Sequence, residues 1–152
     1  MVSAAKWGAI VGVAVYIISQ ALYFAGVALF GPSPADPSHP AKYALGCVDL
    51  LIIAFAFSTS GFYAGRETRV AGLGAVAGMV TFVTYGLLLG VIPLGQRVTP
   101  GQGGATLGQD IALGIVTVGI YLGISALIGW LGGRPGATRG KADARQAPSA
   151  PK

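Results

Sequence analysis

The sequence predicts an all-α integral membrane protein, a four-helix bundle followed by a disordered basic C-terminal tail. Four apolar runs are each long enough to cross a bilayer, because a helix rises about 1.5 Å per residue and the hydrocarbon core is about 30 Å thick. Only 10% of the 152 residues are charged, against about 25% in soluble domains. Residues 1–131 are therefore expected to form one transmembrane bundle, with spans at residues 7–30, 43–63, 70–94 and 107–131.

The four runs differ in their polar content. The first, Trp7 to Phe30, has no charged residue and exceeds the roughly 7–15 residues of a secretory signal core, which favours a retained span. The second, Tyr43 to Tyr63, and the fourth, Leu107 to Leu131, each contain one acid. The third, Val70 to Leu94, contains none and follows the short charged turn Arg66-Glu67-Thr68-Arg69. Each run is thus predicted to be one transmembrane helix.

The segment 132–152 differs from the runs before it. Pro135, Pro148 and Pro151 stand among small and basic residues that offer little apolar surface. Because apolar burial must offset the conformational entropy lost on folding, we expect this segment to be a disordered cytoplasmic tail.

The basic residues are distributed unevenly about the spans. With both termini in the cytoplasm, eight of the ten Lys and Arg residues lie inside, and Lys42 and Arg97 lie outside. Because such residues are retained on the cytoplasmic side, the pattern predicts a protein of the inner cell membrane with both termini cytoplasmic. Arg66, Arg69 and Arg134 are expected to set this topology and to contact anionic lipid headgroups. The tail has no aromatic residue to stack on bases, so no nucleic acid partner is expected.

Glycine is the second strong signal, with 25 of the 152 residues. Many glycines lie four residues apart, and this small-xxx-small spacing lets two helix backbones approach closely. The residues expected to pack helices are Gly8, Gly12, Gly61, Gly65, Gly74, Gly78, Gly86, Gly90, Gly119 and Gly123, and the pairs Gly104/Gly108 and Gly129/Gly133 have the same spacing.

Each span also carries a polar face, which facing helices can satisfy and lipid cannot. Asp49 lies six residues after Tyr43, roughly 9 Å inside the second span. Tyr23 and Tyr85 fall at nearly the same depth, with Thr81 one turn before Tyr85, so these four residues form a candidate intramembrane polar site. An ionised carboxylate there costs on the order of several kcal/mol. Asp49 is therefore either a protonatable or cation-binding group or a hydrogen-bonded residue that fixes helix register.

The sequence carries no pattern typical of catalysis. One cysteine, Cys47, and one histidine, His39, cannot form a disulfide or a clustered metal site, and no phosphate-binding loop is present. We therefore expect no catalytic, cofactor-binding or metal-binding residues, and no enzymatic activity.

The stretch Gly61-Phe62-Tyr63-Ala64-Gly65-Arg66, followed by Ala71-Gly72-Leu73-Gly74-Ala75-Val76-Ala77-Gly78, resembles small bacterial and archaeal four-span membrane proteins of unknown function. These proteins share a Gly-x-x-Ala-Gly-Arg turn followed by a glycine-zipper helix. The resemblance covers the middle third of the chain. It implies a compact helical bundle and carries no activity with it.

Two functions fit these features. The first is a non-enzymatic bundle that works by helix packing, as a homo-oligomer or as an accessory subunit of a larger membrane complex. The glycine pairs favour it, because they outnumber those that four helices need for their own contacts. The alternative is a small proton- or cation-coupled transporter or channel in which Asp49 binds the ion.

Overall fold

The computed structural model describes residues 1–30, 40–91 and 107–146. Within these residues the chain forms four helices: α1 (Val2–Phe30), α2 (Pro40–Thr68), α3 (Gly72–Val91) and α4 (Leu107–Gln146). All four are long and apolar enough to span a membrane, as in a multi-pass membrane protein. The predicted all-helical architecture of four membrane-span-like helices is confirmed.

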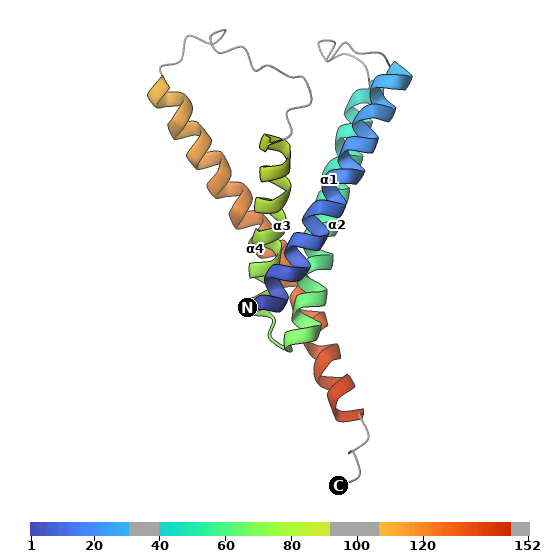
Figure 1. The fold of residues 1–152 in the computed structure, drawn as a ribbon, viewed down its shortest axis with the longest axis vertical. Coiled ribbons are helices and arrows are strands. Elements are labelled where there is room, and N and C mark those ends of the chain that lie inside the picture. Colours follow the sequence, from blue (N-terminus) through green and yellow to red (C-terminus); the bar gives the residue numbers. More distant parts are fainter. Residues whose placement is uncertain (31–39, 92–106, 147–152) are drawn as a thin grey trace.

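The two middle helices form the centre of the bundle. α2 and α3 contact each other, and each also contacts both α1 and α4, whereas α1 and α4 do not meet within the described residues. Figure 1 shows the N-terminus, the α2–α3 turn and the C-terminal part of α4 at one end, which we call the hairpin end. Toward the opposite end, the open end, α4 diverges from α1 and α2 (Figure 1).

The turn between α2 and α3 is held by one threonine. The hydroxyl of Thr68 donates to the carbonyl oxygen of Ala64 at 2.6 Å and accepts a hydrogen bond from the Val70 amide at 3.4 Å. Between them, Arg69 has a φ of 60°, in the left-handed region that residues other than glycine rarely adopt. This single left-handed residue lets the chain reverse within a few residues.

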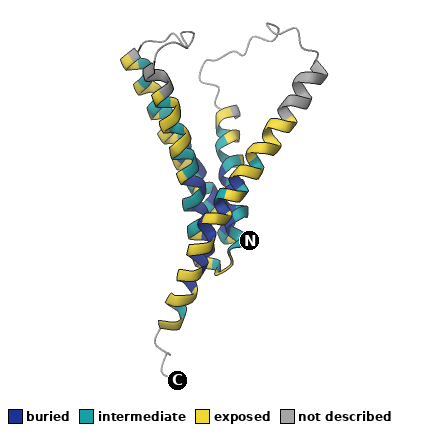
Figure 2. Cartoon of the chain, turned by 180° about the vertical axis from the view of Figure 1, so that it is seen from behind, coloured by how far each residue is buried: buried dark blue, intermediate teal, exposed yellow. Residues whose placement is uncertain are grey.

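The interior is made of small side chains. The largest fully buried side chains are Ser60, Thr81 and Ser125, whereas bulky residues such as Leu51 and Phe55 are exposed. Figure 2 shows the buried residues gathered where the helices meet, with exposed residues along the diverging arms. This distribution suits a lipid environment, where association depends on close packing and bulky apolar groups can face the hydrocarbon.

The prediction of a disordered tail is wrong for residues 132–146. These residues are the last part of α4, which has 40 residues and at about 1.5 Å per residue is about 60 Å long. Pro135 lies inside the helix, and its side chain is exposed. The remaining predicted tail, 147–152, lies outside the described residues. The order has a physical cause in three glycines, described below, that pack this segment against α2.

Candidate functional site

The predicted polar site is centred on a contact between α1 and α2. The hydroxyl of Ser19 on α1 donates a hydrogen bond of 2.6 Å to Oδ1 of Asp49 on α2. Ser19 is buried, at 8% exposure, and Asp49 is half-buried. Ser19 lies one turn before Tyr23 on the first span and was not predicted as a partner of the acid. Its hydroxyl gives Asp49 the hydrogen-bond donor that lipid would not supply.

The other three predicted residues take different positions. Tyr85 on α3 lies near both Ser19 and Asp49. Thr81 is fully buried one turn away, where its hydroxyl donates to the Ala77 carbonyl at 2.9 Å. Tyr23 is 47% exposed and packs edge-on against Phe24, with ring centroids 5.8 Å apart. The structure thus gathers Ser19, Asp49 and Tyr85. Thr81 lies one turn nearer the hairpin end, and Tyr23 lies on the outer surface.

This cluster brings one carboxyl group and two hydroxyl groups together from three helices. A carboxyl group can exchange a proton, and neutral hydroxyls can accept or donate as its charge changes. Within the described part of the chain, no three His, Cys, Asp or Glu side chains lie close enough to hold a metal ion together. The chemistry that the cluster offers by itself is therefore protonation, or weak coordination of a cation by one carboxylate and its hydroxyl neighbours.

A second set of predicted residues, the glycines, fills the helix contacts. A Cβ atom on Gly8 would lie 2.7 Å from both the Ala77 carbonyl oxygen and Cβ of Val80, and one on Gly12 would lie 2.9 Å from the Thr81 carbonyl oxygen. Glycine at these positions therefore lets α1 approach the backbone of α3. The glycines that meet α4 in the same way are Gly61 and Gly65 of α2 and Gly74 and Gly78 of α3, each of which would place a Cβ against the backbone of Ser125, Gly129 or Gly133.

The remaining predicted glycines lie apart from these contacts. Leaving aside the backbone of its own helix, a Cβ atom on Gly86, Gly119 or Gly123 would have no atom of the described residues within 4 Å. Gly86 is on α3, and the other two are on the part of α4 nearer the open end. The surroundings of Gly90, Gly104 and Gly108 lie outside the described residues.

The glycines that order the end of α4 were not among the predicted packing residues. Gly132, Gly136 and Gly140 would place a Cβ atom against the carbonyl oxygens of Ser58, Phe62 and Arg66 respectively. Four-residue spacing on both helices makes this one continuous contact between α4 and α2. That spacing is present in the sequence, but the prolines and basic residues of the same segment are typical of disorder.

Large aromatic residues mark one level near the hairpin end. Trp7 stacks on Tyr63 with ring centroids 4.7 Å apart, and its Nε1 donates to Glu67 at 2.6 Å. Trp130 lies on α4 between Gly129, which contacts Gly61, and Gly133, which contacts Gly65, so it lies beside the turn of α2 that carries Tyr63. We call Trp7, Tyr63 and Trp130 the aromatic belt, because Trp and Tyr gather at membrane–water interfaces.

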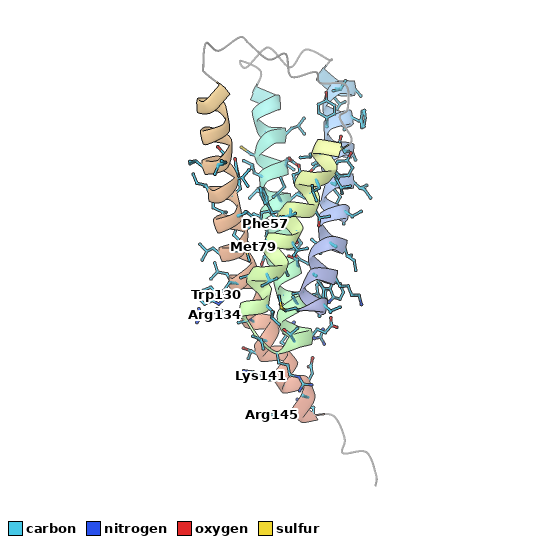
Figure 3. All side chains as sticks on the ribbon, turned by 60° about the vertical axis from the view of Figure 1, so that its left-hand side comes forward. Phe57, Met79, Trp130, Arg134, Lys141 and Arg145 are labelled. Atoms are coloured by element: carbon cyan, nitrogen blue, oxygen red, sulfur yellow. The ribbon has the colours of Figure 1, made fainter. Side chains whose placement is uncertain are left out.

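The three predicted topology residues all lie on the hairpin side of this belt. Arg66 pairs with Asp143 of α4 through Nη2 at 2.9 Å and Nε at 3.0 Å. Arg134 lies over the Trp130 ring, 4.6 Å from its centroid, and Arg69 occupies the α2–α3 turn. Figure 3 shows Trp130, Arg134, Lys141 and Arg145 in succession down α4. The basic residues therefore begin where the aromatic belt ends.

No protein family, no curated protein and no solved structure matches the chain.

Proposed function

We propose that this chain is a non-enzymatic multi-pass membrane protein that works by helix packing, as a homo-oligomer or as an accessory subunit of a larger membrane complex. The observation that carries the proposal is the pair Gly119 and Gly123 on α4. Both have small-xxx-small spacing and open surroundings, while the equally spaced Gly129 and Gly133 lie against other helices.

The open pair has the shape that a second helix requires. Val116 and Ile120 lie beside it and are 57% exposed each, so apolar side chains border a notch without side chains. Lipid chains make few additional van der Waals contacts in such a notch. The backbone of another helix can approach it closely and pack along its length. Gly86 on α3 is open in the same way and supports a second contact surface.

The test compares the size of the assembly across three proteins in mild detergent. Gly119→Leu with Gly123→Leu fills the notch, and we expect the assembly to dissociate while the fold is retained. Gly46→Leu is the matched control, because Gly46 is also open but lies on α2. An unchanged assembly in the double variant, or equal dissociation in the Gly46 control, would contradict the proposal.

For the placement in the membrane, we propose the inner cell membrane with the hairpin end and both termini in the cytoplasm. There Arg134 and the basic residues that follow it on α4 meet anionic lipid headgroups, and Arg66 and Arg69 lie at the level of the lipid phosphates. The succession from aromatic belt to basic residues supports this placement. A tag on Lys152 and a probe at Arg66 should report the cytoplasm, and a probe at Ser38 should report the outside. The reverse pattern would overturn the orientation.

A second candidate function rests on the hydrogen bond between Ser19 and Asp49. We propose, as the alternative, a small proton- or cation-coupled transporter or channel in which Asp49 releases and rebinds the ion beside Tyr85. Asp49→Asn keeps an acceptor for Ser19 and removes the titratable group, so it should abolish flux into liposomes while the protein stays folded. Asp143→Asn is the matched control, because it removes a carboxyl group that lies outside this cluster. Unchanged flux in the Asp49 variant would exclude this function.

A further inference from the structure

A pocket of about 490 Å³ opens at the hairpin end, next to the contact between Gly140 and Arg66 and apart from the Asp49 cluster. It is lined by the stacked pair Trp7 and Tyr63, by Arg66, Glu67 and Arg69 at the end of α2 and in the turn, and by Asp143 of α4. Its volume is within the range of about 300–1,000 Å³ that is common for small-molecule sites. Three separate segments of the chain therefore build it.

The charges in the pocket balance, with two cations and two anions. Arg66 uses Nε and Nη2 on a single oxygen, Oδ2 of Asp143, so its other N–H groups are available to an acceptor. Glu67 receives the Trp7 indole N–H, and a carboxylate accepts further hydrogen bonds through its remaining lone pairs. Arg69 brings the second cation from the turn. A pocket with equal numbers of positive and negative groups suits a ligand that carries one positive and one negative charge.

We propose that this pocket binds the headgroup of a zwitterionic phospholipid with a phosphodiester and a primary ammonium group. Arg66 and Arg69 would bind the phosphate, and Glu67 and Asp143 would accept the N–H groups of the ammonium. The proposal rests on the membrane placement given above and is independent of the packing function.

The position of the pocket explains why a lipid, rather than a soluble compound, is the occupant. Trp7 and Tyr63 belong to the aromatic belt, which lies at the boundary of the hydrocarbon. Arg66, Glu67 and Arg69 lie three to six residues beyond Tyr63, on the side of the boundary where headgroups are found. Asp143 lies farther along α4 and joins them through its ion pair with Arg66. The acyl chains of a lipid seated there would run toward the open end, along the apolar outer faces of α1 and α2, where Ile10 and Phe55 are exposed.

The chemistry of the two carboxylates distinguishes among headgroups. A primary ammonium donates three hydrogen bonds, whereas a quaternary ammonium has no N–H to donate. An anionic headgroup such as glycerol phosphate would meet Glu67 and Asp143 without a balancing cation. We therefore expect an ethanolamine headgroup to bind more tightly than a choline or a glycerol headgroup with the same acyl chains.

The experiment is native mass spectrometry of the full chain released from nanodiscs. The nanodiscs contain equal amounts of phosphatidylethanolamine, phosphatidylcholine and phosphatidylglycerol with identical acyl chains. We expect one ethanolamine lipid to be retained preferentially by the natural protein. Glu67→Gln keeps an acceptor for Trp7 and removes the negative charge, so it should lower this retention about tenfold, as expected for one charge-assisted hydrogen bond. Arg69→Asn should lower it similarly, because asparagine tolerates the left-handed backbone of that position. Lys141→Gln, which removes an exposed charge outside the pocket, should have no effect.

Several outcomes would overturn the proposal. If phosphatidylglycerol is retained as strongly as phosphatidylethanolamine, the pocket is a site for simple anions. Unchanged retention in Glu67→Gln would show that the carboxylate takes no part. Free glycerophosphoethanolamine bound as tightly as the lipid would show a site for a soluble compound. Failure of the chain to enter nanodiscs would instead contradict the membrane placement, and the assembly mass reports separately on the packing function.

Discussion

Gly61 of α2 lies directly against the backbone of Gly129 of α4. A Cβ atom on Gly61 would lie 2.7 Å from the carbonyl carbon of Gly129 and 2.8 Å from its Cα. Gly78 of α3 meets the same residue from the other side, since a Cβ on Gly129 would lie 3.0 Å from the Cα of Gly78. Three helices thus converge on one glycine, with no side chain between their backbones.

This convergence predicts that Gly61→Ala destabilises the protein. The added methyl group has no space, and overpacking of this kind costs about 1–3 kcal/mol. The matched control is Gly86→Ala, where the added Cβ would meet no atom of the described residues within 4 Å apart from its own helix backbone and alanine favours the helix by up to about 1 kcal/mol. Thermal unfolding in detergent should show a lower transition temperature for the first variant only. Equal transitions in both variants would contradict the contact.

The second prediction concerns residues 132–146. Because Gly132, Gly136 and Gly140 hold this segment against α2, its amide hydrogens should exchange slowly with deuterium. Gly136→Leu should separate the two helices locally and raise the exchange rate there. Fast exchange of the segment in the natural protein would instead restore the disordered tail that its composition suggested. Asp143→Asn should change exchange little, because the Arg66–Asp143 pair is 50% and 54% exposed and such surface pairs contribute little.

The third prediction concerns the hydrogen bond from Ser19 of α1 to Asp49 of α2. Ser19→Ala removes the donor to Asp49, and hydrogen bonds between transmembrane helices contribute about 0.6 kcal/mol on average and about 1.7 kcal/mol at most. We expect a loss of stability in that range. Thr59→Ala is the control, since the Thr59 hydroxyl bonds only to the Phe55 carbonyl of its own helix among the described residues. If Thr59→Ala lowers the stability as much as Ser19→Ala does, the hydrogen bond between Ser19 and Asp49 does not contribute specifically to stability.

The fourth prediction concerns the turn residue with a φ of 60°. Arg69→Gly should stabilise the protein by about 1 kcal/mol, because glycine adopts the left-handed region without strain. Arg69→Val should destabilise it, since a β-branched side chain tolerates that region poorly. Thermal unfolding of the two variants measures both effects. If Arg69→Val is as stable as Arg69→Gly, the left-handed turn is not formed.

Much of the fold was predictable because membrane spans depend on length and apolar composition, which the sequence displays directly. The end of α4 was not, because its order depends on a contact with α2 that composition does not reveal. Pro135 and the basic residues suggested disorder. The glycine spacing orders the segment only because the glycines pack against the backbone of Ser58, Phe62 and Arg66 on α2.

The candidate polar site was predictable in part. The depth of Asp49 within its span indicated a need for a partner, and helical spacing placed Tyr85 and Thr81 on a polar face. The choice of Ser19 over Tyr23 depends on the rotation of α1, which the sequence does not fix. Ser19 and Tyr23 are one turn apart on the same face, and the structure buries the first and exposes the second.

The most direct test of the packing function is the number of copies of the chain in particles cut from the native membrane with its own lipids. A chain of 15.3 kDa that works by helix packing should be found as a fixed multiple of itself, or at fixed stoichiometry with another membrane protein. Particles that contain a single copy and no other protein would contradict the account.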